Sequence, residues 1–261
     1  MTTDMQPPER QRLIVDHVNN HGRVTVDALA ASMSISRETI RRDLAALAGK
    51  GLIFKFHGGA RPVGAPRHER PAEGPFLARM NENVEAKRRI AAAAAALFKL
   101  GYTLFVDTGS TTVFLAEELA RRSGLSLITN SCAIADHVSR GEGNRVFLIG
   151  GEYRTGAAEN VGRLAIEQIR TLKAEHVVLT VGALDVDGIF DFDLQEAEVA
   201  REMIARARRL TVILDASKLG KAAIFQVCAL DRLERVVVDQ PPPSLIADAL
   251  AAAGVDVLVA K

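Results

Sequence analysis

The chain has 261 residues, 48% of them hydrophobic and 25% charged, which is enough apolar sequence for one large core or two modest ones. The formal net charge of +1 excludes a chain that is basic over its whole surface, so any nucleic-acid binding must be local. The N-terminus lacks the basic and apolar regions of a signal peptide and no apolar run is long enough to cross a bilayer, so we expect a cytoplasmic protein.

The two cysteines, Cys132 and Cys228, both lie in apolar contexts. Such contexts favour buried thiols in a reducing compartment over a disulfide or a metal site. We therefore expect neither a metal ion nor a cofactor.

The first predicted elements are short helices. Apolar residues recur at helical spacing in residues 9–20, and Gly22 ends that helix. A brief extended piece at 24–26 leads into a second short helix at 27–33. A tight turn at 34–35 separates this helix from the next.

A third helix is predicted at 37–47, with Ser36 as its N-cap. Ile40, Leu44 and Leu47 follow the i, i+4, i+7 pattern and bury one side of it. The other side and the leading end of the helix carry Arg37, Glu38, Thr39, Arg41, Arg42 and Ala45.

Two short helices across a tight turn, followed at 52–57 by a strand that alternates like an exposed hairpin, predict a winged helix-turn-helix. The basic outward side of the third helix suits the phosphate backbone of DNA. The alternative is a solvated helical face in a small protein-interaction domain. The residues expected to contact operator DNA are Ser36, Arg37, Thr39, Arg41, Arg42, Lys55 and His57.

A segment rich in proline and glycine at 59–76 predicts a linker between a DNA-binding domain at 1–58 and a second domain at 77–261. The second domain begins with a long helix at 81–100. Continuous apolar strands alternate with helices after it, which predicts an α/β domain with a doubly wound parallel sheet. The strands are expected at 102–107, 125–129, 145–149, 176–182, 210–214, 235–239 and 255–259.

The turn at 107–112 follows a predicted strand and precedes a helix at 112–120. It contains one glycine and three neighbouring hydroxyl side chains. Backbone N–H groups and the helix dipole at such a turn suit an anion. The alternative is an ordinary capped turn with Ser110 or Thr111 as the N-cap.

Other predicted strands also end in polar residues, and the carboxyl ends of parallel strands meet at one edge of a sheet. Arg154 and Lys218 follow two of these strands and could pair with a phosphate. The residues that could hydrogen-bond hydroxyl groups are Asn130, Asp185, Asp187 and Glu196. Together they suit a phosphorylated polyol or sugar, although each alone is equally compatible with a solvated charge or an ordinary turn.

The segment Thr39-Ile-Arg-Arg-Asp-Leu44, with Gly58-Gly-Ala60, resembles the amino-terminal signature of the DeoR family of bacterial transcriptional regulators. Matching motifs of the second half are Lys87, residues 107–112, Thr129-Asn130-Ser131, Gly150-Gly151 and Asp215-Ala-Ser-Lys218. The resemblance covers nearly the whole chain. It implies a homo-oligomeric repressor of a carbohydrate or glycerol catabolic operon, a dimer or tetramer, controlled by a phosphorylated metabolite.

Family members resemble ribose-5-phosphate isomerase in their sensor domain, which implies that Lys87 and Lys218 surround the effector. After Asp187 this chain has Gly-Ile-Phe-Asp-Phe-Asp in place of the lysine- and glycine-rich segment of the isomerase, so we expect a sensor without catalysis. The alternative is an isomerase-type enzyme with a fused DNA-binding domain.

Residues 187–196 and 239–243 resemble the branch of the family that responds to glycerol 3-phosphate. We therefore expect this effector first, with hexose or pentose phosphates such as those of fructose and deoxyribose as alternatives. The expected effector residues are Lys87, Asp107, Gly109, Ser110, Thr111, Thr112, Asn130, Arg154, Asp187, Glu196 and Lys218.

Overall fold

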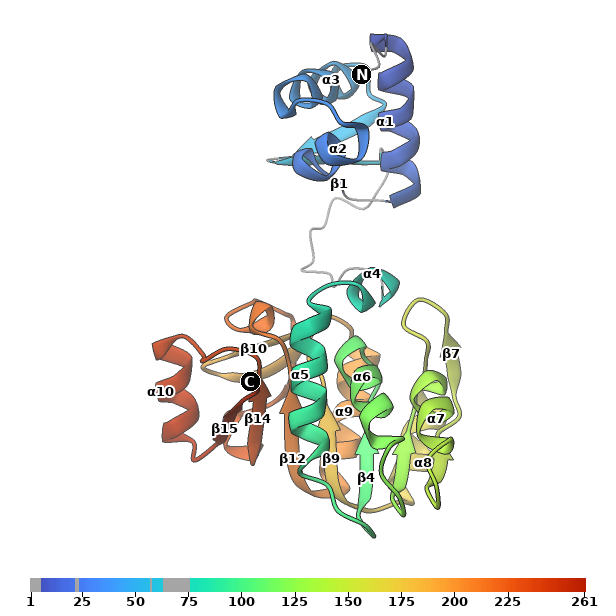
Figure 1. Ribbon diagram of the computed structural model, residues 1–261, viewed down its shortest axis with the longest axis vertical. Helices are drawn as coiled ribbons and strands as arrows, with labels where there is room; N and C mark the ends of the chain where they lie inside the picture. Colours follow the sequence, from blue (N-terminus) through green and yellow to red (C-terminus); the bar gives the residue numbers. More distant parts are fainter. Residues whose placement is uncertain (1–5, 22–23, 57, 63–75) are drawn as a thin grey trace. The chain divides into compact units, whose positions relative to one another are not determined.

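The computed structural model describes residues 6–21, 24–56, 58–62 and 76–261, in two compact units at 1–69 and 70–261 (Figure 1). His57 and most of the predicted linker lie outside the described residues. Within the described ranges, no helix has both the length and the apolar character needed to cross a membrane.

The N-terminal unit is a winged helix-turn-helix, as predicted. Its elements are α1 (Pro7–His21), β1 (Val24–Thr25), α2 (Val26–Met33), α3 (Arg37–Gly49), β2 (Ile53–Phe56) and β3 (Gly59–Pro62). The three strands form an antiparallel sheet in the order β1-β3-β2. Apolar side chains of α1, α2, α3 and the sheet pack into one core that includes Ile14, Leu29, Ile40, Leu44 and Ile53.

Two local conformations shape this unit. Ser34 adopts a left-handed conformation (φ 55°) that ends α2, which allows the tight turn before α3. Ser36 then starts α3, because its side-chain oxygen accepts a hydrogen bond from the N–H of Thr39 at 3.2 Å.

The N-terminal unit continues past the boundary that the sequence predicted. Residues 59–62 were expected in the linker, yet they form β3, which pairs with both β1 and β2. Gly58 has a φ of 89°, so the chain turns there and returns along β2. Gly58 therefore lies in the turn of a wing that β2 and β3 form.

The C-terminal unit contains a seven-stranded, entirely parallel sheet in the order β15-β14-β12-β9-β4-β5-β6. Its strands are β4 (Thr103–Val106), β5 (Ser126–Thr129), β6 (Arg145–Leu148), β9 (Ala174–Leu179), β12 (Ala207–Ile213), β14 (Arg235–Val238) and β15 (Asp256–Val259). All seven overlap the strands predicted from apolar runs.

Helices cover both faces of this sheet (Figure 1). On one face lie α5 (Val84–Ala95), α6 (Ser110–Leu119) and α7 (Cys132–Ser139), with the short α4 (Phe76–Met80) beside them. On the other face lie α8 (Arg163–Arg170), α9 (Leu194–Ala205) and α10 (Ser244–Ala252). The doubly wound architecture is thus confirmed.

The long helix predicted at 81–100 is shorter in the structure. Asn83 has a left-handed conformation (φ 52°), which separates α4 from α5. An α-helix cannot continue through such a residue. The alanine-rich pattern extends the helical periodicity, but α5 ends at Ala95.

Two small antiparallel elements were not predicted. A two-stranded hairpin pairs β7 (Glu152–Arg154) with β8 (Glu159–Val161), and a three-stranded sheet joins β10 (Ala183–Asp185), β11 (Gly188–Asp191) and β13 (Phe225–Cys228). Two short 3-10 turns, η1 (Ala216–Lys218) and η2 (Leu230–Arg232), complete the unit. The β7–β8 hairpin and the small three-stranded sheet add side chains near the carboxyl ends of the main parallel strands.

Candidate nucleic-acid interface and ligand cleft

The outward side of α3 presents guanidinium groups that pair with exposed carboxylates of α2 and α3. Arg37 lies 2.8 Å from Asp27 of α2, while Glu38 lies 3.3 Å from Arg42 and 3.9 Å from Arg41. All five side chains are more than half exposed, so each pair contributes less than about 1 kcal/mol. A nucleic-acid phosphate can therefore replace these partners at little cost.

The other residues predicted to contact DNA differ in their surroundings. Ser36 and Thr39 bond to each other at the start of α3, with their side-chain oxygens 2.9 Å apart. Lys55 is exposed on β2. His57 lies outside the described residues.

The inward side of α3 is held to α1 by a buried carboxylate. Asp43 is 5% exposed, and its side chain accepts hydrogen bonds from Arg10 Nε at 2.5 Å and from Gln11 Nε2 at 3.1 Å. Lys50 in turn donates to the side chain of Gln11 at 3.0 Å. This chain of bonds sets the orientation of α3 on α1.

A cleft lies at the carboxyl ends of β4, β5 and β9, where the β7–β8 hairpin and the start of α9 approach them. Its cavity volume is about 20 Å³, enough for a group the size of one water molecule. We call it the acidic cleft, because its lining includes Asp107, Asn130, Glu159, Asp191 and Glu196, together with Arg79.

Arg154 forms ion pairs with three carboxylates beside the cleft. It lies directly opposite Glu159 in the β7–β8 hairpin, and its guanidinium lies 2.7 Å from Asp193, 3.7 Å from Glu196 and 3.8 Å from Glu159. Burial by itself would raise the pKa of Asp193, but the hydrogen bond from Arg154 holds that pKa below its usual value. Arg154 is therefore engaged with carboxylates.

Burial dominates the two deepest carboxyl groups of the cleft. It raises the pKa of Glu159 to about 7, although Arg154 and a hydrogen bond with Glu196 oppose the shift. Burial also raises the pKa of Asp107 well above its usual range, although the carboxylate accepts a hydrogen bond from the N–H of Thr180 at 3.1 Å. Both groups resist carrying a full negative charge.

The predicted turn at 107–112 forms a close contact with β9 and then starts α6. A Cβ atom on Gly109 would lie 2.0 Å from Cγ2 of Thr180, so only glycine fits there. The hydroxyl residues at 110–112 are each at most 5% exposed, and Thr112 donates to the carbonyl of Gly109 at 3.0 Å. The Thr112 hydroxyl is therefore used within the turn itself.

A second polar group lies beside α5. Lys87 is 2% exposed and donates a hydrogen bond to the carbonyl of Arg79. Burial lowers the pKa of Lys87, Asp215 opposes this shift, and Lys218 adds to it. Asn83 ties the group together, because its amide donates to Asp215 at 3.0 Å. Arg79 links this group to the acidic cleft, which it also lines.

Family comparisons cover both units. A match to the DeoR-like helix-turn-helix domain spans residues 10–63, and a match to the DeoR C-terminal sensor domain spans residues 82–240. The chain belongs to the DeoR family. It is accordingly a DNA-binding transcriptional regulator.

Similar DeoR-family relatives extend over nearly the whole chain. The glycerol-3-phosphate regulon repressor of Escherichia coli is 32% identical over 244 residues, which covers 92% of this chain and 93% of that protein. The transcriptional regulator GlpR of Haloferax volcanii is 31% identical and covers 97% of this chain and 98% of that protein. The transcriptional repressor AccR of Agrobacterium fabrum is 31% identical, with 91% and 92% coverage.

Solved structures overlap this chain more loosely. Ribose 5-phosphate isomerase A of Methanocaldococcus jannaschii gives a TM-score of 0.39 at 16% identity, over 53% of this chain and 55% of that one. The translation initiation factor eIF-2B of Pyrococcus horikoshii gives 0.42 at 13% identity, over 90% and 82%. Overlaps at this level say nothing about activity.

The structure gathers six of the predicted effector residues of this DeoR sensor into two neighbouring groups. It places Asp187 apart from both groups. Four of the six, Asp107, Asn130, Arg154 and Glu196, lie in or beside the acidic cleft. Lys87 and Lys218 lie in the second group. Asp187 is exposed in the turn between β10 and β11 and does not line the cleft.

Glu159, Asp191 and Arg79 were not among the predicted residues. The prediction considered residues that follow a parallel strand, whereas Glu159 and Asp191 belong to antiparallel strands and Arg79 to the short α4. None of the strands predicted from the sequence contained Glu159.

Proposed function

We propose that this DeoR-family member represses a carbohydrate or glycerol catabolic operon and that a phosphorylated metabolite, with glycerol 3-phosphate as first choice, controls its affinity for operator DNA. The 32% identity to a glycerol-3-phosphate regulon repressor over 92% of the chain carries the choice of effector. The protein would act in the cytoplasm, where the operator is.

The effector would occupy the edge of the sheet where β4, β5 and β9 end. Its phosphate would meet the N-terminal backbone of α6 and the Lys87–Lys218 group, since these offer the positive potential. Asn130 and the cleft carboxylates would accept hydrogen bonds from its hydroxyl groups. The sequence predicted that Arg154 pairs with the phosphate. Because three carboxylates already surround it, Arg154 would instead hold these carboxylates in place.

Repression would require an oligomer. One recognition helix reads only a half-site, so a dimer or tetramer is needed to cover an operator. Effector would change DNA affinity by the difference in its own affinity for the DNA-bound and free arrangements.

The DNA-binding assignment is tested by replacing Arg41 and Arg42 together with alanine. We expect operator affinity to fall about 100-fold or more, because both guanidinium groups are exposed on the outward side of α3. Fluorescence anisotropy measures this with operator fragments that the full-length protein selects from a random DNA library. The matched control is Arg163→Ala, an exposed arginine of α8, which should leave affinity unchanged.

The sensor assignment has its own readout in the same double variant. Glycerol 3-phosphate should raise the unfolding temperature of wild type and of the double variant equally. Operator affinity that survives the double replacement would show that α3 is not the recognition helix.

We also propose that the cleft binds its ligand without converting it chemically. Among the described residues that line the cleft, Arg79 is the one cation and no lysine occurs. An aldose–ketose conversion needs groups that shuttle a proton between neighbouring carbons. Incubation with ribose 5-phosphate should yield no ribulose 5-phosphate; its formation would establish the enzyme alternative.

A further inference from the structure

Two buried side-chain oxygens in the acidic cleft accept no hydrogen bond from the described part of the chain, although one of them lies in an ion pair with Arg154. They are Oδ1 of Asn130 and Oε1 of Glu159, and each residue is 1% exposed. A buried polar group without a partner costs about 1–3 kcal/mol. Both residues line the same cleft, so one bound group with hydrogen-bond donors would satisfy both acceptors.

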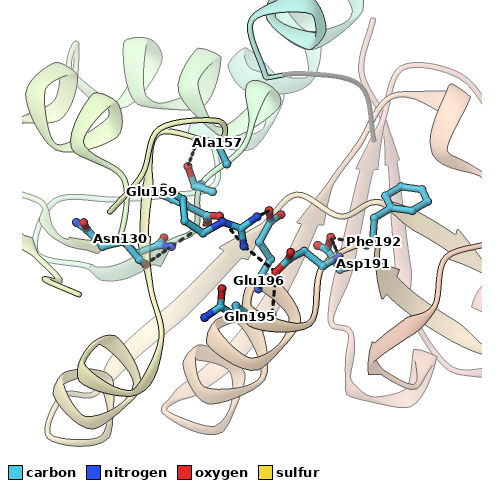
Figure 2. A network of polar contacts seen from close by, with 11 residues as sticks. Asn130, Ala157, Glu159, Asp191, Phe192, Gln195 and Glu196 are labelled. Carbon is cyan, nitrogen blue, oxygen red and sulfur yellow. Dashed lines mark hydrogen bonds and ion pairs between the residues drawn. The ribbon is translucent and has the colours of Figure 1, made fainter. Parts of the chain in front are cut away.

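The rest of each side chain is firmly fixed. Nδ2 of Asn130 donates to the carbonyl of Asn160 at 3.1 Å and to Oε2 of Glu159 at 3.4 Å (Figure 2). The N–H of Asn160 donates to the carbonyl of Asn130 at 2.8 Å. These bonds hold β5 to the β7–β8 hairpin and leave Oδ1 and Oε1 in fixed positions, which is the preorganisation that a binding site requires.

The charges of the cleft decide what kind of group fits. Four carboxyl groups line it, those of Asp107, Glu159, Asp191 and Glu196. Burial already opposes ionisation of the first two, so another negative charge in the cleft would be strongly disfavoured. A hydroxyl group carries no charge and donates one hydrogen bond, so two hydroxyl groups of a polyol would satisfy the two acceptors.

A hydroxyl also fits better than an ammonium group. The guanidinium of Arg154 lies 3.8 Å from Oε1 of Glu159, so a group bound to this oxygen is close to a positive charge. A hydroxyl oxygen accepts a hydrogen bond from a guanidinium while its hydrogen is donated elsewhere. An ammonium group only donates and is repelled by Arg154.

We propose that the acidic cleft selects the uncharged, hydroxyl-bearing end of the effector and rejects any compound with a second anionic group at that end. The ligand class is then a polyol or sugar monophosphate, as opposed to a phosphorylated carboxylic acid or a bisphosphate. Glu159 and Asn130 are the specificity-determining residues. This inference rests on the proposed function, because it assumes that the phosphate is bound outside the cleft.

The test compares pairs of compounds that differ only at the end distant from the phosphate. Isothermal titration of the full-length protein would use glycerol 3-phosphate against 3-phosphoglycerate, and glucitol 6-phosphate against 6-phosphogluconate. In the pair that shows measurable binding, we expect the compound with the uncharged end to bind at least about tenfold more tightly than the compound with the carboxylate. Equal or tighter binding of the acid in that pair overturns the inference and leaves a phosphorylated effector standing.

A third pair is fructose 6-phosphate and fructose 1,6-bisphosphate. If none of the six compounds binds, the proposal of a phosphorylated effector is wrong, and this inference is wrong with it. The two failures are therefore distinguishable in a single series of titrations.

The substitution Glu159→Gln identifies the residue that discriminates. Glutamine keeps an acceptor at Oε1 and cannot ionise, so in titrations at pH 8, above the pKa of Glu159, the preference within the responsive pair should shrink by about tenfold. The matched control is Glu167→Gln on the surface of α8, which should keep the wild-type preference. If the Glu159 variant does not fold, Glu196→Gln serves the same purpose. An undiminished preference in the variant that folds would overturn the role of these carboxylates.

Discussion

At the scale of single residues, the cleft depends on which carboxylates keep their charge. Glu159 and Asp193 are neighbours of the same guanidinium, yet their pKa values move in opposite directions. Glu159 is 1% exposed and lies 3.8 Å from Arg154, whereas Asp193 is partly exposed and lies 2.7 Å from it. Desolvation therefore prevails at Glu159, and the hydrogen bond prevails at Asp193.

Burial of Glu159 predicts a pH-dependent stability. The folded-state pKa of about 7 exceeds the ordinary value of 4.5, so stability is fully present below pH 4.5 and is lost as pH rises through 7. Because Glu159→Gln removes this dependence, the variant should gain stability relative to wild type as pH rises from about 5 to about 8, by roughly 1–3 kcal/mol. Urea denaturation at both pH values measures the difference.

Other carboxyl groups titrate in both proteins, so their contributions cancel in this comparison. Glu167→Gln, on the exposed surface of α8, should show a constant difference from wild type across the same range. A constant difference for the Glu159 variant as well would mean that Glu159 is ionised in the folded protein at pH 5.

At the scale of elements, α3 has two sides with separate tasks. Its outward side carries exposed guanidinium groups, and its inward side carries Asp43 and the apolar residues of the core. Asp43 also ties α3 to α1 through Arg10. The orientation of the outward side thus depends on a carboxylate on the buried side of the same helix.

Replacing Asp43 by alanine should test this dependence. Loss of the buried carboxylate removes the ion pair with Arg10 and the hydrogen bond from Gln11, at a cost of about 1–3 kcal/mol in the free energy of unfolding. Operator affinity should fall about tenfold although every outward cation remains. Thermal unfolding and fluorescence anisotropy measure the two effects.

Asp27→Ala is the control, because it breaks an exposed pair with Arg37 and should cost less than about 1 kcal/mol. Full operator affinity in the Asp43 variant would show that α3 keeps its orientation without this tie.

At the scale of the whole molecule, each unit has its own core. The apolar cluster of the N-terminal unit draws on α1, α2, α3 and the wing, and the two clusters of the C-terminal unit draw on the faces of the parallel sheet. A substitution that abolishes effector binding in the C-terminal unit is therefore expected to leave the operator affinity of the effector-free protein unchanged. The substitution Lys218→Ala separates the two functions.

We expect this variant to bind the operator with wild-type affinity and to need about tenfold more effector for release, since Lys218 contributes positive potential beside Lys87. Titrating effector into the protein–DNA complex measures the response. Lys221→Ala, an exposed lysine three positions along, is the matched control. A wild-type response would remove Lys218 from the effector site.

The sequence predicted the main sheet closely and the cleft only in part. Long apolar runs at 102–107 and 210–214 indicate buried strands, because only a strand covered on both faces tolerates such a run. The hairpin at 152–161 has no such run, and it pairs through backbone hydrogen bonds that leave no periodic signal. Glu159 was missed for that reason.

Sequence alone determined the order of the two units, the winged helix-turn-helix, the parallel sheet and the strand ends at which polar residues gather. These features depend on local periodicity, capping and turns, which neighbouring residues encode. Tertiary structure decided that Arg154 binds Asp193, Glu196 and Glu159, that the hydroxyls of 110–112 are buried, and that two acceptors are left in the cleft. Burial and charge pairing arise between residues far apart in the chain, and no local pattern records them.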